Sequence, residues 1–218
     1  MFIRLLRLYV LPVFVLAMVF SSVVIASEDE GLYDEVPPEN SAFIRFLHAQ
    51  DGESEVPPIV NGRKRDGVKF GGIKPYGVVA SGTVNLELGQ GKGAFETEAG
   101  KYYTAILKNN VLTLEVVPEI ENELKAQMIV HNLTERDNIT LKTADGKVSV
   151  IGPIAPNSFQ VREINPIKVS FAIFSGDEKF VDLIDWPLER GESYIISVAE
   201  GDEYGAVANY DRARISTE

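Results

Sequence analysis

Few side chains in this sequence could carry out chemistry. There are two histidines, His48 and His131, and no cysteine. A metal site usually needs several histidines or carboxylates that converge, and neither histidine belongs to a metal-binding motif. A serine nucleophile needs a sharp elbow such as G-x-S-x-G, which does not occur here. Each histidine falls near the end of a predicted strand, so we expect both to be surface residues at the rim of the fold.

The segment GRKRDGVK, residues 62–69, is the one basic cluster in a chain of formal net charge −11. It contains Arg63, Lys64 and Arg65. The simplest interpretation is a solvated hairpin tip. The alternative is a docking patch for an acidic partner or a uronate polymer. Because the chain as a whole is acidic and repels phosphates, we predict no nucleic-acid partner.

Two further candidates for partner contact lie in the second half. The stretch VREINPIKVSFAIF, residues 161–174, places Arg162 and Glu163 before an Asn-Pro corner and an alternating strand. The two charges could form an acid–base pair. We interpret them instead as loop residues, with Glu163 bonded to Arg162 or to a backbone N–H, and keep Arg162 as a contact candidate. Trp186 is the aromatic residue best suited to contact a ligand.

The first 26 residues have the layout of a secretory signal peptide. Arg4 and Arg7 precede an apolar run, and cleavage is expected after Ala26, which predicts export to the periplasm. An uncleaved membrane anchor is the alternative. Removing the two arginines changes the formal charge from −11 to −13. An acidic, extended lead-in follows over residues 27–40.

From residue 41 onward the pattern predicts strands. Short β-branched and aromatic runs alternate with turn dipeptides, and no long segment has a helical period, so the class is all-β. Hairpin turns are predicted at Asn61-Gly62, Asn109-Asn110 and Asp145-Gly146, since Asn and Gly tolerate positive φ. A chain of this length can form its core without disulfides.

The two halves of the chain resemble each other. Five pairs of segments occur in the same order: residues 42–49 with 126–133, the turns at Gly62 and Gly146, 71–75 with 152–156, 85–91 with 171–177, and 100–107 with 191–198. The repeat predicts two tandem antiparallel β-sandwich domains of similar topology, over residues 41–120 and 125–218. Tyr103 and Tyr194 occupy matching places, which indicates a shared core or corner role.

Several blocks resemble the alginate biosynthesis protein AlgF family. They are residues 139–147 (ITLKTADGK), 162–166 (REINP) and 188–192 (LERGE), with weaker similarity at 32–45 and 101–104. The similarity runs in order over nearly the whole exported chain. The resemblance implies a periplasmic protein of two β-sandwich domains that acts with membrane and periplasmic alginate O-acetyltransferase components on polymannuronate. It implies no catalytic residues and no cofactor.

Three hypotheses follow. The first is a non-catalytic adaptor that brings the acetyltransferase components together. The second is a carbohydrate-binding module that presents the polyuronate through Arg63, Lys64 and Arg65. The third is an acetyltransferase that uses His48 or His131 with a serine.

Overall fold

The computed structural model describes residues 37–183 and 186–213. The predicted signal peptide and most of the predicted lead-in lie outside the described residues. Within them the chain forms strands, turns and loops, and none of its segments is a helix long and apolar enough to cross a membrane. The all-β prediction is therefore confirmed.

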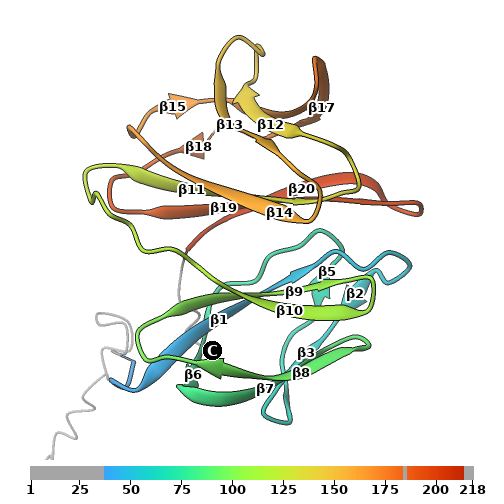
Figure 1. The fold of residues 1–218 in the computed structure, drawn as a ribbon, viewed down its shortest axis with the longest axis vertical. Coiled ribbons are helices and arrows are strands. Elements are labelled where there is room, and N and C mark those ends of the chain that lie inside the picture. The colour runs from blue at the N-terminus through green and yellow to red at the C-terminus, as the bar shows by residue number, and fades with distance from the viewer. Residues whose placement is uncertain (1–36, 184–185, 214–218) are drawn as a thin grey trace, which may run out of the picture. The chain divides into compact units, whose positions relative to one another are not determined.

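Sandwich one is built from two four-stranded sheets and a small two-stranded sheet (Figure 1). The β1 sheet has the order β10-β9-β1-β6: Val111–Val116, Tyr102–Lys108, Ser41–His48 and Gly77–Ala80. The β3 sheet has the order β4-β3-β7-β8: Arg63–Lys64, Pro58–Val60, Gly82–Leu88 and Gly91–Thr97. The small sheet pairs β2 with β5: Glu55–Val56 and Val68–Lys69.

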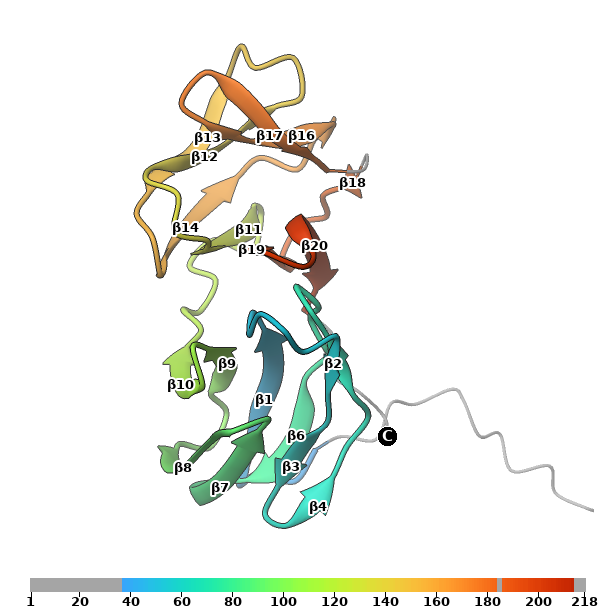
Figure 2. The ribbon, with the colours of Figure 1, turned by 90° about the vertical axis from the view of Figure 1, so that its right-hand side faces the viewer.

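Sandwich two repeats this plan. The β11 sheet has the order β14-β11-β19-β20: Ser158–Ile164, Ala126–Leu133, Ser193–Gly201 and Gly205–Arg212. The β12 sheet has the order β13-β12-β16-β17: Ser149–Ile154, Ile139–Thr143, Phe171–Ser175 and Glu178–Asp182. A small sheet pairs β15 with β18: Lys168–Val169 and Trp186–Pro187. Figure 2 shows the same strands from the side.

The four-stranded sheets of the two sandwiches have one topology, whereas the small sheets, β2-β5 and β15-β18, stand at different places in the chain order. β1, β6, β9 and β10 hold the same places as β11, β14, β19 and β20, which confirms the prediction of two sandwiches of similar topology. Most neighbouring strands are antiparallel, but each sandwich contains one parallel pair, β1 with β9 and β11 with β19. Ile44 lies beside Tyr103 and Met128 beside Tyr194, so the two strand pairs also share their register.

The three predicted hairpin turns are present, two of them as two-residue turns and the third, at Asp145-Gly146, within the longer turn of residues 144–148 that connects β12 to β13. Asn61 and Gly62 connect β3 to β4 with φ of 48° and 79°. Asn109 and Asn110 connect β9 to β10 with φ of 50° and 61°. Because both central residues of such a two-residue turn need positive φ, asparagine and glycine are favoured there.

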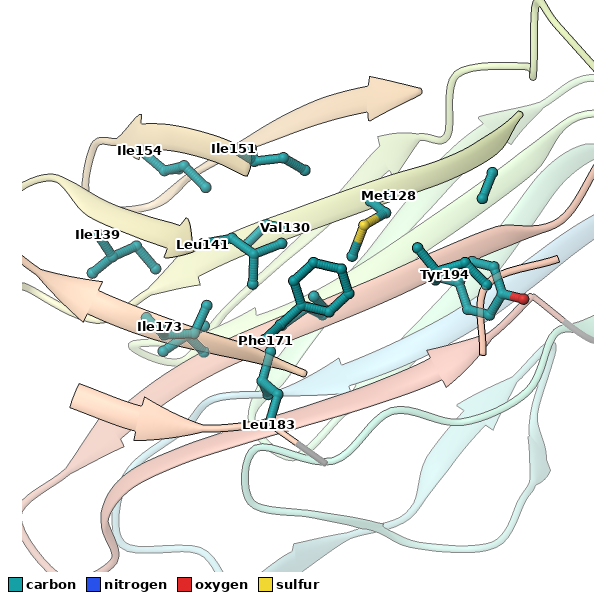
Figure 3. Packing of buried hydrophobic residues seen from close by; sticks show 14 residues of the cluster. Met128, Val130, Ile139, Leu141, Ile151, Ile154, Phe171, Ile173, Leu183 and Tyr194 are labelled. Carbon is teal, nitrogen blue, oxygen red and sulfur yellow. The ribbon is translucent and has the colours of Figure 1, made fainter. Parts of the chain in front are cut away.

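Alternating apolar residues fill each sandwich. In β7, the even positions Val84, Leu86 and Leu88 are buried and the residues between them face solvent. Figure 3 shows the equivalent cluster of sandwich two, in which Met128 and Val130 from one sheet meet Phe171 and Ile173 from the other. This face-to-face packing of two sheets is the usual core of a β-sandwich.

Tyr103 and Tyr194 confirm the predicted corner role. Both rings are buried, and each hydroxyl accepts a hydrogen bond from the backbone N–H five residues earlier, at Glu98 (2.8 Å) and Glu189 (2.9 Å). Each tyrosine therefore holds the turn that leads into its own strand, in the manner of the tyrosine corner of immunoglobulin-like sandwiches.

Removing either hydroxyl should destabilise the protein. We expect Tyr103→Phe and Tyr194→Phe each to lower the free energy of unfolding by about 1 kcal/mol, because a partly buried N–H loses its acceptor. Urea unfolding measures this loss. Tyr102→Phe is the control, since that ring stacks on Phe43 and its hydroxyl takes no part in a corner. An equal loss in the control would contradict the corner role.

Two local predictions differ from the structure. Arg162 and Glu163 do not lie in a loop: they belong to β14 and pair with Met128 and Gln127 of β11. The Asn-Pro corner begins only after Ile164, so the strand continues past the charged pair. The predicted strand 168–174 is divided at Ser170 into β15 and β16.

Candidate functional site

The outer faces of the β1 and β11 sheets contact each other, and we call this contact the seam. Both sandwiches belong to one unit, residues 35–218. The apolar part of the seam is one cluster of buried residues drawn from both sandwiches: Leu47, Ala49, Phe70, Ile106, Ile129, Leu133, Ile195 and Ala199. Ser197 Oγ and Asn209 Nδ2 both donate to the carbonyl oxygen of Gly71, at 2.8 and 3.0 Å.

A charged residue lies inside this contact. Arg45 of β1 is fully buried, and its guanidinium carbon stands 3.8 Å from the centre of the Tyr76 ring. No described residue accepts a hydrogen bond from its Nε, Nη1 or Nη2. Burial lowers the pKa of Arg45, and Tyr76, followed by the negative charge of Asp211, acts in the opposite direction. The seam thus holds a guanidinium with few compensating contacts.

His131 lies close enough to this arginine for the positive charge of Arg45 to act on its imidazole. Its Nδ1 is 3.5 Å from Glu115 Oε2, and its ring stacks on Phe159 with centroids 5.0 Å apart. Burial, and then the charge of Arg45, lowers the pKa of His131 to about 3. The short contact with Glu115 is therefore not an ion pair at neutral pH, although its geometry resembles one.

The surroundings of His131 do not form a nucleophilic site. Ser197 is its neighbour on β19, but the Ser197 hydroxyl is buried and donates to the backbone. The hollow beside His131 has no internal space for a water molecule. It is lined by Thr104, Glu115, Val116, Val117, Pro118, Ile129, His131 and Phe159.

Both nitrogens of His48 bond to the backbone. Gln50 N–H donates to Nδ1 at 3.2 Å, so Nε2 carries the proton and donates to the Glu53 carbonyl oxygen at 2.8 Å. Burial lowers the pKa of His48. Among the described residues, no three histidines, aspartates or glutamates gather where they could hold a metal ion.

The prediction that both histidines are rim residues is wrong. His48 is 0% and His131 is 3% exposed. The alternation of a single sandwich assigns one face of each strand to the core and the other to solvent. His131 lies on the face that the other sandwich covers, and the loop Gln50–Glu53 encloses His48.

The structure places the three basic candidates together at the edge of the β3 sheet. Arg63 and Lys64 form β4, which Figure 2 shows beside β3, and Arg65 follows. All three residues are exposed. None of them forms an ion pair with another described residue. A two-residue, charged edge strand also prevents edge-to-edge association of sheets.

The other candidates lie apart from that cluster, in sandwich two. Arg162 is exposed, and its Nη1 donates to the Val150 carbonyl oxygen. Glu163 accepts hydrogen bonds from the backbone N–H groups of Glu121 and Asn122, at 2.6 and 3.2 Å. Of the two partners expected from the sequence, Arg162 or a backbone N–H, the structure has the second. The backbone of Trp186 pairs with Val169, and its side chain is outside the described part of the chain.

Sequence reasoning missed Arg45 and Glu115. The available signal was the composition of β1: Phe43 and Leu47 stand on the face opposite Ala42 and Ile44, so both faces are largely apolar. A strand that is apolar on both faces is covered on both sides. Arg45 is the exception on the seam face, where the repeat has Ile129.

The sequence matches the family described as Alginate O-acetyl transferase AlgF over residues 15–195. It is 36% identical to the alginate biosynthesis protein AlgF of Pseudomonas aeruginosa over 169 residues, 77% of each chain. The Pseudomonas putida protein of that name is 32% identical over 174 residues, 79% of this chain and 80% of that one.

Solved structures of single domains are also similar. The C-terminal domain of AlgF from Pseudomonas aeruginosa is 39% identical, with a TM-score of 0.37, and the match covers 41% of this chain and 98% of that domain. The N-terminal domain is 22% identical, with a TM-score of 0.33, and the match covers 38% of this chain and all of that domain. On the family match and the two full-length relatives, this chain belongs to the AlgF family.

Proposed function

We propose that this protein is a non-catalytic periplasmic adaptor in alginate O-acetylation, which brings acetyltransferase components together. The observation that carries the proposal is the state of its two histidines. His48 has both nitrogens bonded to the backbone, and His131 is buried and neutral down to about pH 3. A general base near neutral pH needs an accessible group with a matched pKa, and neither histidine offers one.

Tethering explains how an adaptor could raise the rate of acetyl transfer. Two weakly associating proteins that bind one scaffold meet at the effective concentration set by that scaffold, which can reach millimolar values. Two joined sandwiches offer separate loops and edges to separate partners. The signal peptide predicted over residues 1–26 supports export, and a chain without cysteine needs no oxidative folding step in the periplasm.

The proposal is tested by deleting the gene and measuring the acetyl content of the secreted polymer. We expect acetylation to fall and to return with the wild-type gene and with a His48→Gln, His131→Leu double variant. Purified protein should bind separately purified acetyltransferase components and should not hydrolyse an acetyl ester. Rapid ester turnover that the double variant abolishes would favour the third hypothesis, an acetyltransferase.

A second candidate is polyuronate binding by the basic edge. It is favoured by the exposure of Arg63, Lys64 and Arg65 without described ion-pair partners. Binding to polymannuronate should then weaken with salt and on replacing the three cations with glutamine, because contact between exposed charges is screened. Absence of binding at millimolar uronate removes this candidate.

A further inference from the structure

Each sandwich contributes a glycine at a place where the other sandwich leaves no room for a side chain. Gly71 belongs to sandwich one, and a Cβ atom on it would lie 2.8 Å from Val207 Cγ1 of sandwich two. Gly201 belongs to sandwich two, and a Cβ atom on it would collide with Asp51 Oδ1 and lie 3.1 Å from Phe70 Cζ, both of sandwich one. The backbone of each sandwich therefore packs directly against the other.

The two glycines differ in what their backbones require. Gly71 has a φ of 71°, which favours glycine whatever surrounds it. Gly201 is the last residue of β19, and its φ is not positive, so its backbone accommodates any L-residue. At Gly201 it is the other sandwich, through Asp51 and Phe70, that excludes a side chain.

Directional contacts surround these glycines. The Gly71 carbonyl accepts the two side-chain hydrogen bonds of sandwich two that are described above. Asp51 Oδ2 accepts from the backbone N–H of Asp202, at 3.0 Å. The ring of Phe70 stacks on Tyr204, with centroids 4.6 Å apart. Apolar packing is non-directional, whereas hydrogen bonds need a narrow range of angles, so these contacts define how one sandwich is rotated on the other.

A second set of contacts lies across β1 from the first. Lys108, the last residue of β9, donates from Nζ to Glu135 Oε1 at 2.7 Å and to Asn157 Oδ1 at 2.5 Å, both in loops of sandwich two. Ile73, two residues after Gly71, bridges to β1 on the side away from β9. The seam is thus bonded on both sides of β1, which opposes rotation of the sandwiches about that strand.

The linker that runs from β10 to β11 in Figure 2 is bonded to both sandwiches. Gln127 of β11 is buried, and its Nε2 donates to the carbonyl oxygens of Pro118 and Glu119, both at 3.1 Å. The Glu119 carboxylate pairs with Lys101 of sandwich one, and Glu163 of β14 accepts from two linker N–H groups. A hinge needs residues whose φ and ψ are free to change, and these bonds hold the linker in one conformation.

We propose that the seam locks the two sandwiches into one rigid body, which holds the partners of each sandwich at one fixed separation and orientation. Domains joined by a small polar contact move relative to each other, whereas a large apolar contact suppresses that motion. This seam combines a buried apolar cluster, directional bonds on both sides of β1 and a linker bonded to both sandwiches. The fixed separation of partners rests on the adaptor function, whereas the lock is a property of this chain alone.

The lock is tested by measuring the distance between two spin labels. The chain has no cysteine, so Lys92→Cys on β8 and Glu178→Cys on β17 are labelled selectively, and both positions are exposed. Pulsed electron paramagnetic resonance then gives the distribution of distances between the sandwiches. We expect one narrow distribution. A broad distribution in this otherwise unaltered chain would overturn the lock.

Gly201→Val in the labelled chain should open the seam, because valine suits a strand but collides with the other sandwich. We expect the distance distribution to become roughly twofold broader or more. The matched control is Ala206→Val, which adds volume to the same hairpin at an exposed position on the opposite face from Val207. The control should keep the narrow distribution, and equal broadening in both variants would contradict the role of Gly201.

Circular dichroism checks that both sandwiches of the Gly201→Val variant remain folded. If this variant does not fold, Gly201→Ala adds a single carbon and should broaden the distribution to a smaller extent. A folded variant of either kind with the distribution of the unaltered chain would show that the contact at Gly201 does not hold the seam.

The consequence for function is tested with the same variants in cells. Gly201→Val should lower the acetyl content of the secreted polymer by roughly half or more, because a scaffold raises effective concentration only while its partners meet in a suitable geometry. The purified variant should bind each acetyltransferase component as wild type does. Wild-type acetylation by a variant with a broadened distribution would overturn the need for fixed geometry. If the wild-type protein binds no acetyltransferase component, the adaptor function fails, and the label distances still decide whether the seam is locked.

Discussion

Replacing His131 with leucine is expected to make the protein less sensitive to acid. Wild-type stability should fall as the pH drops from about 6.5 toward 3, and the His131→Leu variant should escape that part of the loss. The physical reason is the cost of burying a charged imidazole, which holds the pKa of His131 at about 3 in the folded protein.

The sign follows from proton linkage. The pKa of His131 is lower in the folded chain than its ordinary value of 6.5, so the unfolded chain binds the proton first as the pH falls. The stabilising contribution is fully present above pH 6.5 and is lost progressively down to about pH 3. The difference between a pKa of 6.5 and one of about 3 corresponds to about 5 kcal/mol, since one pKa unit is equivalent to about 1.4 kcal/mol.

Leucine is a suitable replacement because the repeat already uses it. Leu47 of β1 holds the place in sandwich one that His131 holds in sandwich two, and both side chains face the seam. At pH 7 the exchange should change stability by about 1 kcal/mol or less, as an apolar side chain of similar size takes the place of a neutral ring.

Urea unfolding at pH 7, 5, 4 and 3 measures the effect. Carboxylates with lowered pKa, such as Asp145 and Glu192, also destabilise the protein in acid. They are common to both proteins, so their contribution cancels in the difference between variant and wild type. Parallel stability curves for the two proteins would show that His131 titrates normally and is not desolvated in the seam.

Much of the fold could be predicted from local chemistry. Asn61-Gly62 and Asn109-Asn110 fix two-residue turns because few other residues adopt positive φ, and the apolar alternation of β7 assigns its core face. The repeat then extends the prediction from one sandwich to two. The parallel pairing of β1 with β9 could not be predicted, since side-chain alternation is identical in parallel and antiparallel strands.

The candidate site was harder to predict for a related reason. Alternation within one strand distinguishes its two faces but does not say what covers the second face. His131 was therefore interpreted as a rim residue, and Arg45 was missed, because the seam that buries them could not be predicted. Exposed positions were easier to predict from the sequence. Arg63, Lys64 and Arg65 follow a turn, the simplest interpretation was a solvated hairpin tip, and all three residues are exposed.

The second large effect concerns Arg45, whose replacement by methionine is expected to stabilise the protein by about 1–3 kcal/mol. Burying an ionised side chain has a penalty of several kcal/mol, and it is offset only when the charge is well paired and hydrogen-bonded. Arg45 has the Tyr76 ring, worth about 2 kcal/mol when desolvated, and the more distant charge of Asp211. Its three nitrogens lack acceptors among the described residues.

Methionine keeps the length of the side chain and its contact with Tyr76, because a thioether also interacts favourably with an aromatic ring. Alanine does not, so Arg45→Ala should leave a cavity in the seam and be less stable than Arg45→Met by about 2 kcal/mol or more. Urea unfolding of the wild type, Arg45→Met and Arg45→Ala at pH 7 separates the effect of the side chain's charge on stability from the effect of its volume. If methionine and alanine destabilise the protein equally, the guanidinium itself stabilises the seam, and its burial is compensated by groups beyond Tyr76 and Asp211.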